Sequence, residues 1–176
     1  MTVLSTPRMT MSPVSIEDFD GLARLWRQEG LTRYITGRPL TDEEVWFRLL
    51  RDIGHWTSLG HGNWSLKLHN GTMIGSVGLF DYRRDLTPAF TDIEVGWVLG
   101  EDWHGQGLAR EAVECALEYA DEKLNLSRTV CMISAENLAS IKLAEAVGFR
   151  FYADGHYKAG PIRLYERMRA KGVVTG

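Results

Sequence analysis

The chain has 176 residues, of which 44% are hydrophobic and 24% are charged, and its formal net charge is −3. This composition is typical of a globular protein with an apolar core, and it excludes disordered, fibrous and collagen-like chains. With 20 basic and 23 acidic side chains, the chain also lacks the positive charge with which proteins bind nucleic acid phosphates.

The cysteines and the N-terminal residues indicate a cellular compartment. Cys115 and Cys131 do not form a CxxC pair, so we expect small buried thiols in a reducing compartment. The N-terminal residues show no basic segment followed by an apolar run, and no segment approaches ~18 consecutive apolar residues. We therefore expect a cytoplasmic protein with no membrane partner. Because the sequence shows neither repeats nor a linker, we expect one domain over residues 1–176.

The first third of the chain predicts one strand and two helices. Residues 7–14 predict a short strand, and Ser15 precedes residues 16–28, whose apolar side chains recur at helical spacing. Thr41, followed by three acidic residues, predicts the start of a second helix. The apolar stripe of this helix consists of Val45, Trp46, Leu49, Leu50 and Ile53.

Three strands follow the second helix. Residues 63–69 and 72–80 predict a hairpin, because Asn70-Gly71 is typical of a two-residue turn. Residues 91–99 alternate between apolar and polar side chains, which predicts a strand with Glu94 and Gly96 on its polar face. Since glycine has no side chain, we expect open space beside Glu94 on that face.

The last part of the chain predicts a helix over 108–124, a buried strand over 128–135 and a helix over 137–147. Asn137 is suited to cap the last helix, and Gly148 stands where helices commonly end. Two strands at 149–155 and 162–169 close the chain. A strand, helix and strand in succession require a parallel crossover within an otherwise antiparallel sheet, which predicts an α+β fold.

A glycine-rich turn joins the strand over 91–99 to the helix that begins at 108. Glycines before a helix expose successive backbone N–H groups, and the helix dipole adds positive charge at that end, so the turn is suited to bind an anion. Gly105 and Gly107 would let a ligand approach the backbone, and Arg110 could add a full charge. No Gly-Lys-Ser/Thr follows, and Arg110 stands where a dinucleotide fingerprint needs its third glycine, so neither of these nucleotide motifs is present.

Two segments of the chain resemble motifs of the GNAT-type N-acetyltransferases. The segment IEVGWVLGEDWHGQGLAREA is similar to the family's acetyl-CoA-binding motif, and NLASIKLAEAVGFRF is similar to its next motif. The segment PRMTMSPVSIEDFDGL resembles the opening of the branch that contains the ribosomal-protein N-terminal acetyltransferases. The likeness spans nearly the whole chain and is most specific from Glu94 to Phe149. One departure is His104, which occupies the place of a signature Gln or Arg.

The resemblance implies a GNAT-like, mostly antiparallel central sheet of about six to seven strands with about four helices. It also implies acetyl-CoA as co-substrate, with the pantetheine arm along Trp97, Val98 and Leu99 and hydrogen-bonded by Asn137. The pyrophosphate would bind the N–H groups of Gly105, Gln106, Gly107, Leu108, Ala109 and Arg110. Backbone N–H groups at Val98 or Leu99 could stabilise the developing oxyanion.

Two side chains are candidates for proton transfer. Glu94 resembles a glutamate that often acts as the base in this family, although it could instead pair with Arg83 or Arg84. Ser140 matches a position that protonates the leaving thiolate in some relatives, although a serine there can also bond to the helix backbone. The five histidines show no ligand spacing, so we expect no metal.

The predicted function is transfer of an acetyl group from acetyl-CoA to a primary amine by direct attack on the thioester. The resemblance favours a protein N-terminal amine as acceptor. A small-molecule amine such as an amino acid, polyamine or aminoglycoside is the alternative within this class. A coenzyme-A-binding sensor without turnover is the alternative outside it. The sequence leaves open whether the protein is a monomer or a homodimer.

Overall fold

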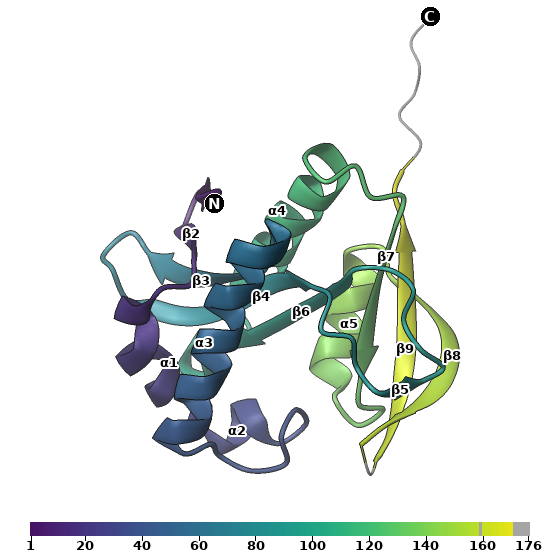
Figure 1. The fold of residues 1–176 in the computed structure, drawn as a ribbon, viewed down its shortest axis with the longest axis horizontal. Helices are drawn as coiled ribbons and strands as arrows, with labels where there is room; N and C mark the ends of the chain where they lie inside the picture. The colour runs from purple at the N-terminus through teal and green to yellow at the C-terminus, as the bar shows by residue number, and fades with distance from the viewer. Residues whose placement is uncertain (159, 171–176) are drawn as a thin grey trace, which may run out of the picture.

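The computed structural model describes residues 1–158 and 160–170. These residues form one central sheet of nine strands (Figure 1). The order across the sheet is β1-β2-β3-β4-β6-β7-β9-β8-β5, and every neighbouring pair is antiparallel except β6 and β7. The strands are β1 (Leu4–Ser5), β2 (Met9–Pro13), β3 (Asn63–Leu68), β4 (Met73–Phe80), β5 (Leu86–Thr87), β6 (Glu94–Leu99), β7 (Arg128–Ile133), β8 (Arg150–Tyr157) and β9 (Gly160–Met168).

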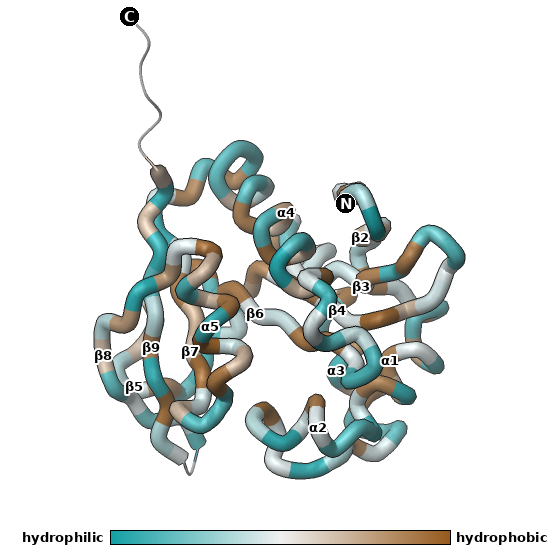
Figure 2. The backbone as a smooth tube through the Cα atoms, turned by 180° about the vertical axis from the view of Figure 1, so that it is seen from behind, coloured by the Kyte–Doolittle hydropathy of each residue, from teal (hydrophilic) through white to brown (hydrophobic). Residues whose placement is uncertain are grey.

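Helices cover both faces of this sheet. α1 and α3 lie in front of it in Figure 1, whereas α4 and α5 lie in front in Figure 2, which views the molecule from behind. The helices of the described residues are α1 (Phe19–Trp26), α2 (Glu29–Thr32), α3 (Asp42–Leu59), α4 (Leu108–Glu122) and α5 (Leu138–Ala146), with 3-10 turns η1 (Ile16–Asp18) and η2 (Glu101–Trp103). The predicted α+β class and mostly antiparallel sheet are confirmed.

The helix starts follow from local capping. The Thr41 side chain accepts a hydrogen bond from the Glu44 N–H, and the Glu44 side chain reaches back to the Thr41 N–H, so α3 begins with a capping box. Asn137 caps α5 in the same manner, since its side chain accepts from the Ser140 N–H. Gly148, with φ of 99°, follows the end of α5 as predicted.

The strands and helices differ from the predictions mainly at the edges of the sheet. The described residues contain nine strands instead of six or seven, because β1 and β5 add two-residue edge strands whose pairing no periodic pattern reveals. The four-residue α2 is also additional to the predicted helices. The helix predicted over 16–28 is divided into η1 and α1.

The apolar stripe predicted for α3 is wrong in part. Trp46 and Leu50 are 37% and 42% exposed, and the buried face of this helix includes Asp52 and His55 instead. These polar side chains are buried because they accept hydrogen bonds from Asn63 at the start of β3 and from Asp81 and Tyr82 in the segment that follows β4. Apolar stretches recur along β7 and α4, where the sheet and helices enclose the core (Figure 2).

Candidate functional site

The strands β6 and β7 touch at one end and then diverge. Within the described residues they share a single pair, Glu94 with Val130, supported by a hydrogen bond of 3.1 Å from the Val130 N–H to the Ile93 carbonyl. β6 continues to Leu99 with β4 as its sole sheet partner. The β7-facing edge of β6 beyond Glu94, which we call the free edge of β6, therefore carries backbone groups without a strand partner.

The direction of the N–H groups along this strand can be assigned. The Gly100 N–H donates to the Ile74 carbonyl of β4 at 2.8 Å, and Val98 lies opposite Ser76 of β4. Because N–H groups alternate between the two edges of a strand, the Val98 N–H is directed at β4 and the Leu99 N–H at the free edge. Of the two donors named from the sequence, Leu99 is therefore the one available to a ligand at this edge.

The glycine turn leads from this strand into α4. Gly105 and Gly107 have φ of 72° and 76°, in the left-handed region that favours glycine. A Cβ at Gly105 would meet no atom within 4 Å, so the backbone there is bare. Gly107 is the cap residue of α4 and its side is not filled by a capping side chain, so the first N–H groups of the helix face open space. These features fit the predicted phosphate site at Gly105, Gln106, Gly107, Leu108, Ala109 and Arg110.

Arg8 holds this turn from outside, a contact that the sequence did not reveal. Its Nη1 donates to the Gln106 carbonyl at 2.7 Å, and its Nε donates to Glu111 of α4 at 2.6 Å. The Gln106 carbonyl is thereby occupied by Arg8, which leaves the N–H groups as the free polar groups of the turn. Arg110, the predicted phosphate partner, forms an exposed ion pair with Glu114 one helical turn away at 2.8 Å.

Two further side chains near the glycine turn, Glu101 and His104, bond to other parts of the chain. The Glu101 carboxylate accepts a hydrogen bond from the Gly30 N–H of α2, and so it is directed away from the turn. His104, the departure from the family signature, contacts the Leu99 carbonyl through Nε2 at 2.9 Å. This contact ties the turn to the end of β6.

The start of α5 lies at the same end of the sheet as the glycine turn. β6 and β7 are parallel, so the helices that follow them both begin at the carboxyl ends of these strands (Figure 1). Ser140 and Asn137 are both half-buried. The Ser140 hydroxyl has no hydrogen-bond partner within residues 1–158 and 160–170, so the expected alternative, a bond to the helix backbone, is not formed.

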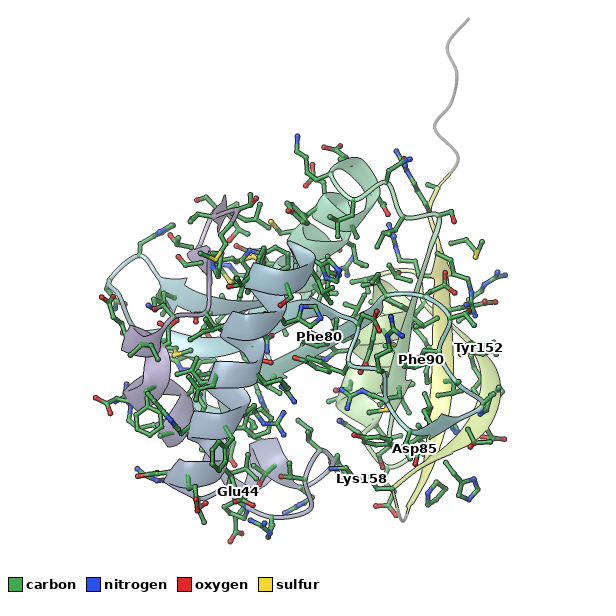
Figure 3. The ribbon with its side chains drawn as sticks, in the orientation of Figure 1. Glu44, Phe80, Asp85, Phe90, Tyr152 and Lys158 are labelled. Carbon is green, nitrogen blue, oxygen red and sulfur yellow. The ribbon has the colours of Figure 1, made fainter. Side chains whose placement is uncertain are left out.

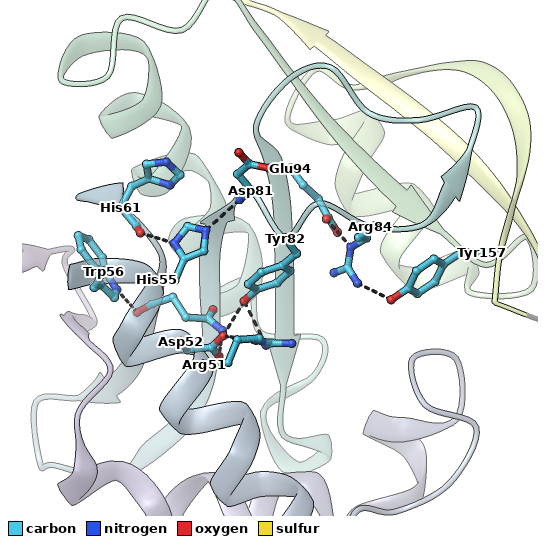
Figure 4. A network of polar contacts seen from close by, with 11 residues as sticks. Arg51, Asp52, His55, Trp56, His61, Asp81, Tyr82, Arg84, Glu94 and Tyr157 are labelled. Atoms are coloured by element: carbon cyan, nitrogen blue, oxygen red, sulfur yellow. Dashed lines mark hydrogen bonds and ion pairs between the residues drawn. The ribbon is translucent and has the colours of Figure 1, made fainter. Parts of the chain in front are cut away.

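Glu94 is buried and paired with an arginine. Its carboxylate is 6% exposed and accepts from Arg84 Nε at 2.6 Å, and Arg84 in turn donates to the Tyr157 hydroxyl at 3.0 Å (Figure 4). The alternative partner named from the sequence, Arg84, is thus present. Burial raises the pKa of Glu94 above its usual range, and Arg84 opposes this shift.

The space expected beside Gly96 is not open. A Cβ at Gly96 would lie 2.7 Å from the ring of Phe80, the residue labelled near the centre of Figure 3, so this ring fills the space on the polar face of β6. Phe80 stacks on Tyr82 with centroids 4.5 Å apart. That expectation is wrong because the aromatic side chain of the neighbouring strand fills the room that glycine leaves.

Glu94 and Phe80 both line a pocket. This pocket, which we call the Glu94 pocket, has a volume of about 530 Å³ and is lined by residues 80–84, 90–94 and 125–128. It lies where the ends of β4, β6 and β7 meet the segments that join them to β5 and α4. Phe90 and Arg128 are among its lining residues.

A second polar network lies between α3 and Tyr82. The Tyr82 hydroxyl donates to Asp52 at 2.7 Å, and Arg51 donates to Asp52 at 2.8 Å (Figure 4). His55 Nε2 accepts from the Asp81 N–H, so Nδ1 carries the proton and donates to the His61 carbonyl. Burial lowers the pKa of His55, which favours this neutral form.

Comparisons with known proteins identify the family of this chain. The profile of the acetyltransferase (GNAT) domain family matches residues 8–150. The chain belongs to the GNAT acetyltransferase family. It is 29% identical over 173 residues to the uncharacterized N-acetyltransferase p20 of Bacillus licheniformis, covering 97% of this chain and 91% of that protein.

Solved structures show the same fold. A protein described as a GnaT-family acetyltransferase from Bordetella pertussis is 32% identical, with a TM-score of 0.84, over 95% of this chain and 99% of its own. RimL, a ribosomal L7/L12 alpha-N-protein acetyltransferase solved in complex with coenzyme A, has a TM-score of 0.78 over 95% of this chain and 98% of its own. At 14% identity, RimL shows the shared fold alone.

The enzyme class follows from the family: the protein is an N-acetyltransferase. Among the helices that residues 1–158 and 160–170 form, none combines the length and the apolar character needed to cross a membrane.

Proposed function

We propose that this protein transfers an acetyl group from acetyl-CoA to a primary amine by direct attack of the amine, without a covalent enzyme intermediate. The observation that carries the proposal is the arrangement around β6. Its free edge, the bare glycine turn before α4 and the start of α5 all lie at one end of the sheet. This end offers backbone donors for an extended arm and for a diphosphate, which are the two recognisable parts of coenzyme A.

The chain's own groups have separate tasks in this proposal. The N–H groups from Gly105 to Arg110 bind the diphosphate, and the free edge at Trp97, Val98 and Leu99 binds the arm as a neighbouring strand would. An N–H group of this free edge stabilises the acyl oxygen as it gains negative charge. Asn137 caps α5 through its side-chain oxygen, which leaves its amide nitrogen to bind the arm.

Glu94 and Ser140 move the protons. The amine attacks as a neutral group, so a proton leaves it, and the Glu94 carboxylate accepts that proton from the side of the Glu94 pocket. A raised pKa makes Glu94 a better acceptor than an exposed glutamate. The half-buried Ser140 hydroxyl, whose bonding capacity is unused, donates a proton to the departing thiolate.

The acceptor that we propose is the N-terminal amine of a protein. RimL acts on such an amine, and the opening segment of this chain resembles the branch of ribosomal-protein N-terminal acetyltransferases. A small-molecule amine is the second candidate, because a pocket of about 530 Å³ is large enough to enclose one beside Glu94.

Thiol release in steady state tests the proposal. The purified protein is mixed with acetyl-CoA and a panel of short peptides with free N-termini, amino acids, polyamines and aminoglycosides. We expect release that depends on the acceptor and is fastest with peptides. Release with small amines only selects the second candidate. Binding of acetyl-CoA without release on any acceptor would instead indicate a coenzyme-A sensor.

A further inference from the structure

Arg48 differs from the other partly buried arginines of the described residues. Four arginines there are half-buried, and three of them are ion-paired: Arg84 with Glu94, Arg128 with Asp92 and Glu166, and Arg167 with Asp121. Arg48, within the same part of the chain, forms no ion pair and donates no hydrogen bond. A half-buried guanidinium whose five N–H donors have no hydrogen-bond acceptor favours an anionic ligand.

Arg48 lies on the face of α3 that carries the polar network with Tyr82 and Asp81. Arg48 precedes Arg51, Asp52 and His55 by three, four and seven residues, so all four share one face of the helix. The other three contact Tyr82 or Asp81. The Arg48 guanidinium stacks on the Trp26 ring at 4.3 Å, which fixes its planar group beside this face.

The surroundings of Arg48 are positively charged. Arg51 and Arg84 lie over the Tyr82 ring at 4.1 and 5.1 Å, and each is bonded to one carboxylate, Asp52 or Glu94. Arg51 and Arg84 therefore each have a carboxylate partner, whereas Arg48 has none. Burial lowers the pKa of Arg48, the charges of Arg51 and Arg84 lower it further, and the Asp52 carboxylate opposes this shift.

We propose that Arg48, supported by Arg51 and Arg84, binds a carboxylate of the amine acceptor, and that the enzyme therefore selects acidic amines. This inference rests on the proposed acetyl transfer and names its acceptor class. The carboxylate would supply the negative charge that this group of arginines lacks, while the amine of the same molecule reaches Glu94. The chemistry is shared by a free amino acid and by a protein N-terminus followed by an acidic residue.

Matched acceptors test this selection on the unaltered protein. One arm compares serine with serinamide, with kcat/KM expressed per neutral amine because the two amines differ in pKa, and the other compares peptides that begin Ser-Asp with peptides that begin Ser-Asn. In at least one arm, kcat/KM should be about tenfold or more higher for the acidic member, because a charged hydrogen bond contributes that much. The arm that shows the preference identifies the source. Equal kcat/KM within both pairs would overturn the inference while the acetyl transfer itself stands.

The variant Arg48→Gln tests whether Arg48 causes the preference for acidic acceptors. We expect kcat/KM for the acidic acceptor to fall to that of the neutral one, with KM for acetyl-CoA unchanged. Arg24→Gln, at an exposed arginine of α1, is the control and should retain the preference. A melting temperature for each variant establishes that it is folded. An equal fall for acidic and neutral acceptors in folded Arg48→Gln would contradict the assignment. Absence of thiol release with every acceptor would instead remove the proposed function itself.

Discussion

Two opposing influences act on Glu94. Burial favours its protonated form, whereas the ion pair with Arg84 favours the carboxylate, and the pKa is raised overall. A general base at neutral pH needs both features, since it has to be ionised before reaction and has to hold the proton afterwards.

Replacing Glu94 with Gln should therefore lower kcat/KM by roughly 10²-fold near neutral pH, because the amide keeps the shape and removes the base. Initial rates of thiol release measure this change. The loss should shrink as pH rises, since more of the amine is then already neutral. Full activity in Glu94→Gln would leave proton removal to water and reduce Glu94 to the partner of Arg84.

The pH profile gives a second test of Glu94. Because its folded-state pKa is raised, the carboxylate becomes protonated at a higher pH than an ordinary glutamate does. Activity of the wild type should thus decline, as pH falls, before an exposed glutamate would titrate. This additional decline, beyond the one that protonation of the amine causes in both proteins, should be absent from the profile of Glu94→Gln. An identical decline in both proteins would assign it to another group.

A substitution at Ser140 distinguishes an effect on acetyl-CoA binding from an effect on the chemical step. If its hydroxyl protonates the thiolate, Ser140→Ala should reduce kcat and leave the affinity for acetyl-CoA nearly unchanged. Steady-state kinetics together with a binding titration measure the two quantities. Unchanged kcat with a lowered melting temperature would show that Ser140 serves only the start of α5.

The residues whose roles were not predicted from the sequence share one property: each contacts a distant part of the chain. Arg8 reaches Gln106 across 98 residues, and Phe80 of β4 fills the space beside Gly96 of β6. No local spacing encodes such contacts. The glycine turn and the Asn137 cap were predictable because their chemistry lies within one turn and the helix that follows it.

At the scale of elements, the glycine turn before α4 is the feature on which binding of acetyl-CoA depends. In Gly107→Val, a β-branched side chain would occupy a left-handed backbone position, 3.4 Å from Arg8 Nη2. We expect acetyl-CoA to raise the melting temperature of the wild type through mass action and to leave that of Gly107→Val unchanged. Thermal denaturation with and without the ligand measures both.

Gly71→Val is the matched control for the glycine turn. Gly71 has φ of 87° and, like Gly107, no close backbone atom around its Cβ position, but it lies in the hairpin between β3 and β4. Its substitution should lower stability by the same kind of strain and keep the ligand-induced shift. A full shift in folded Gly107→Val would show that acetyl-CoA binds elsewhere.

The hydrogen bonds of Arg8 to Gln106 and Glu111, which we call the Arg8 clamp, connect the N-terminal segment to the same turn. Because the Arg8–Glu111 pair is partly exposed, it should contribute only about 0–1 kcal/mol to stability. Arg8→Ala should therefore raise KM for acetyl-CoA by about three- to fivefold through a looser turn, with little change in melting temperature. Arg27→Ala, which removes the exposed pair with Asp42, is the control and should leave KM unchanged. Equal KM values in Arg8→Ala and the wild type would dismiss the clamp.

Elements with strong internal periodicity were predictable, and those defined by pairing were not. The capping residues Thr41 and Asn137 located two helix starts. β1 and β5 are strands because a neighbour pairs with them, and two residues carry no pattern. The buried face of α3 was predicted wrongly because its polar residues pair with the segment after β4, which helical periodicity alone cannot show.

For the whole molecule, the decisive feature is the divergence of two parallel strands in an otherwise antiparallel sheet. The succession of strand, helix and strand predicted one parallel crossover, and β6 and β7 confirm it. Their separation after Glu94 was not predictable, because the residue pattern within one strand does not encode its distance from another strand. That separation leaves the edge of β6 free and brings the starts of α4 and α5 to one end.

The central claim is that coenzyme A binds along this free edge and over the glycine turn. Hydrogen exchange followed by mass spectrometry, with and without coenzyme A, tests it most directly. We predict slower exchange in peptides that cover residues 95–110 and 137–142, and unchanged exchange in the hairpin at 68–73. Unchanged exchange along 95–110 under saturating ligand, or protection confined to another surface, would contradict the claim.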